Sequence, residues 1–251
     1  MYQDPKLYDT LMAPGTAREA KFLDDCFTEH AIGPVKRTLE PACGSGRLLA
    51  ALGKKGYEPH GFDLAPEQVE YCNARLARLE LPGDAWVDDM QKFTPRGKYC
   101  AIYNTVNSFR HLLTERGARA HLRAAADCLR EGGLFVVGLH LMPNTPSRVS
   151  TETWTSGRGK LRVRCRISSA QIEDRVETCD VKVTRPSSSE PPLHTTIQLR
   201  TYSAGEILKT FASEPRLSTV ALYSFTYKKR RGIELEPWHE DSIFVLRKSG
   251  E

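Results

Sequence analysis

The segment from Leu39 to Arg47, followed by Gly61-Phe62-Asp63, constrains the fold of this chain more than any other stretch. It has the pattern of a buried strand, a glycine turn and a helix start, and then a second strand that ends in a carboxylate. Glycine permits strained backbone dihedrals and lets the backbone approach a ligand closely. The helix behind the turn offers unpaired N–H groups, and a carboxylate at the next strand end can accept two hydrogen bonds from a ribose diol. The segment therefore predicts the adenosine-binding half of an α/β sheet.

The residues of the turn argue against a dinucleotide as the ligand. The dinucleotide fingerprint runs G-x-G-x-x-G, and its last glycine allows tight packing of the helix on the strand. Gly44 and Gly46 fill the first two places, but Leu49 stands in the third. Glu40, just before the turn, would repel a pyrophosphate and suits the amino group of a methionine moiety. A dinucleotide-dependent oxidoreductase is therefore the least favoured interpretation.

The turn resembles the first motif of the class I S-adenosylmethionine-dependent methyltransferases, an acidic residue followed by G-x-G-x-G. Four residues carry the resemblance: Glu40, Ala42, Gly44 and Gly46. Alanine replaces the first glycine and is the smallest substitute for it. The resemblance implies that these residues bind S-adenosylmethionine. It also implies a Rossmann-like, doubly wound and mostly parallel sheet of seven strands that ends in an antiparallel hairpin.

Asp63 is the strongest individual candidate for cofactor binding. It ends a strand about 20 residues after the glycine turn, where the acidic partner of the ribose belongs. The alternative is an N-cap role for the helix that begins at Pro66. Leu64, the next residue, would pack on the edge of the adenine.

Asp88-Asp89-Met90 follows the third predicted strand. In the family that the chain resembles, a carboxylate here accepts the adenine amino hydrogen, and the next backbone N–H reaches a ring nitrogen. The common form of the motif is G-D-M, which assigns these roles to Asp89 and Met90. Asp88 stands in place of the glycine, so the choice between the two aspartates stays open. A solvated acidic turn is the alternative.

The segment 103–111 follows the fourth predicted strand, at the edge where cofactor and acceptor must meet. Asn104 could bind the methionine backbone or line the reaction zone, although the N-P-P-Y-like prolines of nucleic-acid amino-methyltransferases are missing. His111 is a candidate general base, because a histidine pKa can lie near neutrality, or else a helix-start or core histidine. His140, near the end of the fifth strand, points toward the same crevice or into the sheet. Tyr8 could close over the sulfonium or contact the acceptor.

Hydrophobic periodicity predicts strands that alternate with helices in the first part of the chain, and hence a parallel sheet. The predicted strands are 35–41, 58–63, 84–87, 99–106, 134–141, 217–227 and 241–247, and the predicted helices are 16–30, 46–55, 66–79, 115–130 and 203–212. The helix at 203–212 opens with a capping box of Ser203 and Glu206.

Between residues 147 and 202 the sequence alternates polar and apolar residues, which predicts three or four antiparallel strands with one buried face. This stretch resembles the β-sheet cap of small-molecule methyltransferases such as the N,N-dimethyltransferases of amino-sugar biosynthesis. We therefore expect a cofactor-binding core at residues 1–146 and 203–251, and an insertion at 147–202 that caps the substrate.

Composition narrows the remaining alternatives. The chain has 251 residues, of which 40% are hydrophobic, enough for one large domain or a domain with an insertion. No apolar run approaches the roughly 18 residues of a membrane span, and residues 1–6 lack a signal-peptide pattern, so we expect a cytoplasmic protein. The seven cysteines stand singly without C-x-x-C spacing, which argues against structural zinc and a disulfide framework. Cys43, inside the glycine turn, has two possible roles: a small residue that fills a tight space, or a catalytic thiol.

The net charge of +5 is modest for this length. The basic run at 228–231 could touch nucleic acid or an anionic substrate, or form a solvated hairpin tip. Three further residues, Trp154, Trp238 and His239, are candidate pocket walls or surface packing residues.

These patterns together predict an S-adenosylmethionine-dependent methyltransferase that transfers a methyl group to N or O of a small-molecule acceptor. No metal, membrane or nucleic acid is expected, and the protein would be a monomer or a homodimer. An RNA or protein methyltransferase is one alternative, in which the basic run at 228–231 would contact the substrate. A non-catalytic regulatory domain that binds S-adenosylmethionine is the other, because Ala42 alters the first motif.

Overall fold

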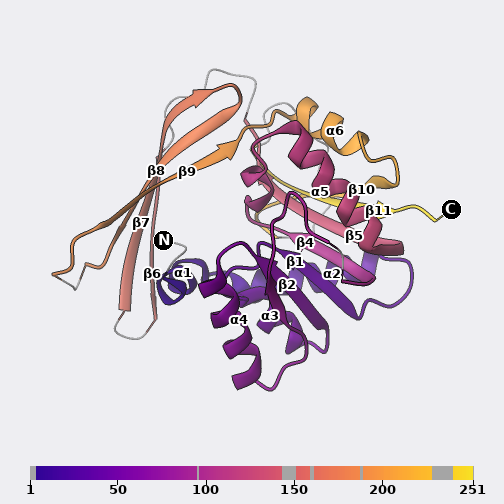
Figure 1. The fold of residues 1–251 in the computed structure, drawn as a ribbon, viewed down its shortest axis with the longest axis horizontal. Coiled ribbons are helices and arrows are strands. Elements are labelled where there is room, and N and C mark those ends of the chain that lie inside the picture. The colour runs from indigo at the N-terminus through magenta and orange to yellow at the C-terminus, as the bar shows by residue number, and fades with distance from the viewer. Residues whose placement is uncertain are drawn as a thin grey trace.

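The computed structural model describes residues 4–94, 96–142, 151–158, 161–186, 189–227 and 240–250. It contains two β-sheets with helices on both sides of the larger one (Figure 1). The predicted basic run at 228–231 lies outside the described residues, and so do Trp238 and His239.

The larger sheet has seven strands in the order β10-β11-β5-β4-β1-β2-β3. The strands are β1 (Arg37–Pro41), β2 (Glu58–Asp63), β3 (Ala85–Val87), β4 (Tyr99–Asn104), β5 (Leu129–His140), β10 (Leu217–Ser224) and β11 (Asp241–Lys248). Strands β1 to β5 pair in parallel, whereas β11 is antiparallel to both β5 and β10. The predicted doubly wound sheet with a terminal antiparallel hairpin is therefore confirmed.

Helices cover both faces of this sheet and bury its apolar side chains. The helices are α1 (Pro5–Met12), α2 (Thr16–His30), α3 (Arg47–Gly53), α4 (Pro66–Arg78), α5 (Glu115–Cys128) and α6 (Ala204–Ala212), with the short 3-10 helix η1 (Ser108–His111) after β4. Apolar residues of α5 and α6 form one core cluster with the strands, and those of α2 and α3 form a second. The predicted capping box of Ser203 and Glu206 opens α6.

The predicted junction between the last core helix and the fifth strand was wrong, because α5 ends at Cys128 instead of Arg130 and β5 begins at Leu129 instead of Leu134. Leu129 already has extended backbone and is fully buried where it pairs with Tyr99 of β4. Burial against the neighbouring strand therefore ends the helix before the glycines at 132 and 133.

The smaller sheet has four antiparallel strands in the order β6-β7-β8-β9. These strands are β6 (Thr151–Arg158), β7 (Leu161–Glu173), β8 (Val176–Thr184) and β9 (Leu193–Arg200). This sheet stands beside the main sheet as a separate layer (Figure 1). Leu7 and Leu11 of α1 pack on its apolar face, against residues such as Val163 and Val181. The predicted antiparallel insertion is thus present, and α1 lies between it and the core.

None of the helices in the described ranges has the length and apolar character that crossing a bilayer requires.

Candidate active site

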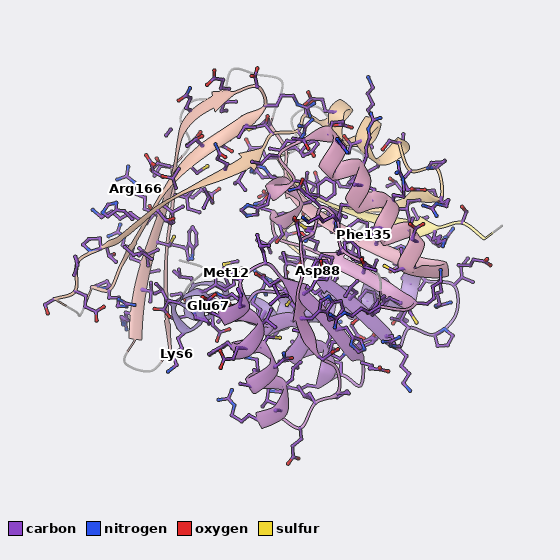
Figure 2. All side chains as sticks on the ribbon, viewed as in Figure 1. Lys6, Met12, Glu67, Asp88, Phe135 and Arg166 are labelled. Carbon is purple, nitrogen blue, oxygen red and sulfur yellow. The ribbon has the colours of Figure 1, made fainter. Side chains whose placement is uncertain are left out.

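A pocket lies at the carboxyl edge of β1 and β4, where open α/β sheets receive their ligands. Its walls are Tyr8, Met12, Glu40, Pro41, Ala42, Cys43, Arg47, Asn104, Thr105, Val106 and Ser108. Figure 2 shows Met12 in the region between the smaller sheet and the main sheet. Three predicted site regions, which are the N-terminal tyrosine, the glycine turn and the segment after β4, therefore meet in one place.

The turn between β1 and α3 has left-handed backbone at three of its predicted positions. The φ angles of Ala42, Gly44 and Gly46 are 54°, 52° and 69°. A Cβ atom at Gly44 would lie 2.6 Å from the Tyr8 ring, and one at Gly46 would overlap the sulfur of Cys72 in α4. The two glycines thus let α1 and α4 pack directly against the turn.

Ala42 occupies a conformation that glycine adopts with less strain. The left-handed region costs an L-residue about 1–2 kcal/mol, while glycine in its place loses about 0.4–1 kcal/mol through chain entropy. We expect Ala42→Gly to leave the free energy of unfolding unchanged or to raise it by up to about 1 kcal/mol, as measured by urea denaturation. The control Ala51→Gly, inside α3, should lower it by about 0.5–1 kcal/mol. Equal losses in both variants would contradict the strain at Ala42.

α1 is attached to the turn by buried charges. Asp9 pairs with Arg75 of α4 at 2.5 Å, and it accepts a hydrogen bond of 2.9 Å from the Ser45 hydroxyl. All three side chains are buried. These bonds hold Tyr8, the neighbour of Asp9, over the pocket.

Glu40 places a carboxyl group in the wall of the pocket. Its side chain is buried, and within the described part of the chain its Oε2 atom has no hydrogen-bond partner. Burial raises the pKa of Glu40 well above its usual range, although the nearby Arg47 acts in the opposite direction. A buried carboxylate oxygen without a partner is costly. A cationic ligand group in this pocket would remove that cost.

Arg47 brings a positive charge to the same pocket, and the sequence interpretation gave it no role. Its guanidinium pairs with the buried Glu19 of α2 at 2.5 Å. Glu19 also accepts a hydrogen bond from the Thr105 hydroxyl. Burial acts to lower the pKa of Arg47, but the pairing with Glu19 acts to raise it, and the net effect is a raised pKa. The guanidinium therefore stays charged. The pocket therefore has both the Glu40 carboxyl group and the Arg47 guanidinium in its walls. A ligand ammonium group would favour the ionised form of Glu40, so a zwitterion would meet two opposite charges here.

Asp63 lies at the end of β2, and both of its carboxylate oxygens accept hydrogen bonds from backbone N–H groups. Its Oδ2 accepts from the Gly44 N–H at 2.8 Å, and its Oδ1 accepts from the Ala65 N–H at 3.0 Å. Burial raises its pKa, while these bonds act to lower it. The N-cap of α4 is Ala65, so the alternative of Asp63 as N-cap was wrong. The side chain of Leu64 is 71% exposed, which leaves an apolar surface beside Asp63.

The acidic turn after β3 uses both aspartates to hold its own backbone. Asp88 accepts from the Asp89 N–H at 2.8 Å, and Asp89 accepts from the Gln91 N–H at 2.9 Å. The carbonyl of Met90 accepts a 2.8 Å bond from Nδ1 of His121. Burial lowers the pKa of His121 to about 4, so its ring is neutral at physiological pH. Sequence reasoning missed His121 because it lies on the apolar face of α5.

Asn104 joins three segments at the pocket wall. Its amide donates to the Pro41 carbonyl at 3.1 Å, and its Oδ1 accepts from the Phe109 N–H at 3.2 Å. The ends of β1 and β4 and the start of η1 are thereby fixed together. Its predicted contact with the cofactor stays a prediction.

The two candidate histidines stand apart from the pocket walls. His111 ends η1, and burial together with the neighbouring Arg110 lowers its pKa. The Nδ1 atom of His140 lies 3.0 Å from Oδ1 of Asp241 on β11. Neither residue lines the described pocket, so their catalytic roles stay predictions.

Two further candidates have packing roles in the structure. The thiol of Cys43 is buried, and a hydrogen bond with Cys72 and burial raise its pKa well above the usual range. A thiol held protonated in this way is a poor nucleophile. Trp154 of β6 packs with α1 and the smaller sheet. In the described residues, no group of three or more His, Cys, Asp or Glu side chains is arranged to hold a metal ion.

Comparison with known proteins relates part of the chain to methyltransferases. The family described as "Methyltransferase domain" matches residues 38–133. A putative methyltransferase of Geobacillus sp. (strain WCH70), GWCH70_2453, is 24% identical over 135 residues, which are 53% of this chain and 54% of that protein. The match thus spans about half the length of this curated relative.

Solved structures share the whole fold at low identity. An S-adenosylmethionine-dependent methyltransferase from Clostridium acetobutylicum has a TM-score of 0.79 at 16% identity, covering 98% of this chain and 97% of its own. CalS10 from Micromonospora echinaspora, an amino pentose methyltransferase solved with S-adenosylmethionine bound, has a TM-score of 0.74 at 17% identity, covering 93% and 92%. Residues 38–133 therefore match a methyltransferase domain, and the chain has the fold of these S-adenosylmethionine-dependent methyltransferases.

Proposed function

We propose that this methyltransferase transfers the methyl group of S-adenosylmethionine to a nitrogen or oxygen atom of a small-molecule acceptor. The observation that carries the proposal is the pocket at the glycine turn, which both Glu40 and Arg47 line beside left-handed backbone. A methionine moiety carries an ammonium and a carboxylate, so its two charges match this pair.

The residues of the site fit the remainder of the cofactor as well. Glu40 would hold the ammonium group and Arg47 the carboxylate, while Asp63 would accept the ribose hydroxyls. Leu64 offers an apolar surface to the adenine, with Asp89 and Met90 at its polar edge. When bound, the cofactor supplies a sulfonium-activated methyl group, so the protein chiefly has to position the acceptor and exclude water.

The smaller sheet is proposed as the cap over the acceptor. In this proposal, residues 1–146 and 203–251 bind the cofactor, and residues 147–202 complete the acceptor pocket, since a small substrate needs burial. The similarity of the fold to CalS10, an amino pentose methyltransferase, favours an amino sugar as the first acceptor to test. Tyr8 would lie over the methyl group, and the neutral ring of His111 would accept a proton from the acceptor.

Ligand-linked stabilisation tests the cofactor assignment. S-adenosylhomocysteine at about 100 times its Kd should stabilise the protein by about 2.7 kcal/mol and raise its melting temperature. NAD at the same concentration is the control and should have no effect. Equal shifts with both compounds, or none with either, would refute the assignment. An acceptor screen of amino sugars, other amines and phenols should then identify the substrate by homocysteine release.

A further inference from the structure

A buried cluster of four charged side chains joins the smaller sheet to the segment that follows β4. Arg110 of η1, Glu177 of β8 and Arg200 of β9 are each at least 90% buried. Glu115, at the start of α5, completes the cluster from a half-buried position. The cluster therefore has two positive and two negative groups, and all but Glu115 lie away from solvent.

The two arginines cross the junction in opposite directions. From the core, Arg110 donates to the Arg200 carbonyl at 2.9 Å and to the Glu177 carboxylate at 2.6 Å. From the smaller sheet, Arg200 donates to the Leu113 carbonyl at 2.9 Å and to the Glu115 carboxylate at 3.1 Å. We call these four bonds the arginine clasp. A planar guanidinium has donors in fixed directions, so such a clasp sets orientation as well as distance.

The core side of the clasp is continuous with the pocket wall. Val106 and Ser108 line the pocket, and Arg110 follows two residues later. Asn107 fixes the segment to β5, because its N–H donates to the Gly138 carbonyl at 3.1 Å and its Oδ1 accepts from the His140 N–H at 2.7 Å. The segment is thus held by β5 on one side and by the smaller sheet on the other, with His111 directly after Arg110.

We propose that Arg110 is a positioning residue that, through Glu177 and Arg200, sets the placement of the smaller sheet relative to the pocket wall and His111. The proposal rests on the proposed function, because it assumes that the acceptor binds between these two parts. Stability alone would not require charges at this junction, since apolar residues of similar size often stabilise a buried site equally well. The geometry of the clasp is what apolar residues would not reproduce.

The test compares Arg110→Met with the double variant Arg110→Met/Glu177→Met. The single variant leaves Glu177 buried without its partner and should melt at a lower temperature than the wild type. The double variant should recover much of the melting temperature that the single variant loses. Its kcat/KM for the acceptor identified by the screen should nevertheless stay lower by up to about 10²-fold, because small misplacements have effects of this size. Arg216→Met is the control and should keep full turnover; it removes a 2.7 Å pair with Asp127 and a 2.6 Å pair with the buried Glu214, both outside the clasp.

Two acceptor-independent measurements accompany the kinetics. The Kd for S-adenosylhomocysteine should change little in any variant, because the clasp does not touch the glycine turn. Amide hydrogen exchange in β8, β9 and residues 107–113 should be faster in both clasp variants, with β1 and β2 unchanged. A double variant with restored stability, unchanged exchange and full turnover would overturn the proposal. Failure of the wild type to bind S-adenosylhomocysteine would instead refute the proposed function, and the exchange data would still test the clasp.

Discussion

Replacing Asp63 with alanine is expected to weaken binding of S-adenosylhomocysteine by about 10²–10⁴-fold. The carboxylate would accept two hydrogen bonds from the ribose diol, each contributing about 1.5–3 kcal/mol because the acceptor is charged. In the structure the carboxylate also accepts hydrogen bonds from the N–H groups of Gly44 and Ala65, so it stabilises the turn as well as the ligand site. Isothermal titration calorimetry measures the change directly.

A milder variant separates the ribose contact from the shape of the turn. Asp63→Asn keeps a carbonyl oxygen for one backbone donor but removes the charge, so a smaller loss of affinity than in Asp63→Ala is expected. Asp84→Asn is the control, because Asp84 is a 57% exposed aspartate at the opposite, amino edge of the same sheet. Unchanged affinity in both Asp63 variants would remove this residue from the ribose site.

Local signals were sufficient to predict most of the main sheet. The turn between β1 and α3, the carboxylate that ends β2 and the capping box of α6 each depend on residues close together in sequence. Period-2 alternation predicted three or four antiparallel strands for the smaller sheet, and this was possible because its strands follow one another in order. The candidate pocket could be located for the same reason, since parallel strands bring their carboxyl ends to one edge.

The partners of the buried charges could not be predicted from the sequence. Arg47 and Glu19 are 28 residues apart, Arg110 and Glu177 are 67 apart, and His140 and Asp241 are 101 apart. Each pairing depends on how the helices and the smaller sheet pack on the core, which no local pattern contains. For the same reason the sequence indicated Tyr8 as a lid, but not the attachment of its helix to both the glycine turn and the smaller sheet.

Replacing His111 with alanine is expected to lower kcat by about 10²–10⁴-fold if this residue is the general base. Binding of S-adenosylhomocysteine should change little, because a base contacts the acceptor and not the adenosine. Burial and the charge of Arg110 lower the pKa of His111 below its ordinary value of 6.5, so the ring is neutral at physiological pH and able to accept a proton. Single-turnover rates of homocysteine release would measure the chemical step.

The pH dependence of kcat is an independent test of His111 as the base, because protonation of this residue can only lower the rate. As the pH falls through the lowered pKa, His111 gains a proton and loses its capacity as a base, so the rate of the wild type should fall on the acidic side with a midpoint below the ordinary histidine value of 6.5. This acidic limb should disappear from the residual activity of His111→Ala. His194→Ala, which alters an exposed histidine of β9, should keep both the rate and the limb. If His111→Ala retains the full rate, positioning alone accounts for the catalysis, and Tyr8 and Asn104 become the residues that orient the acceptor.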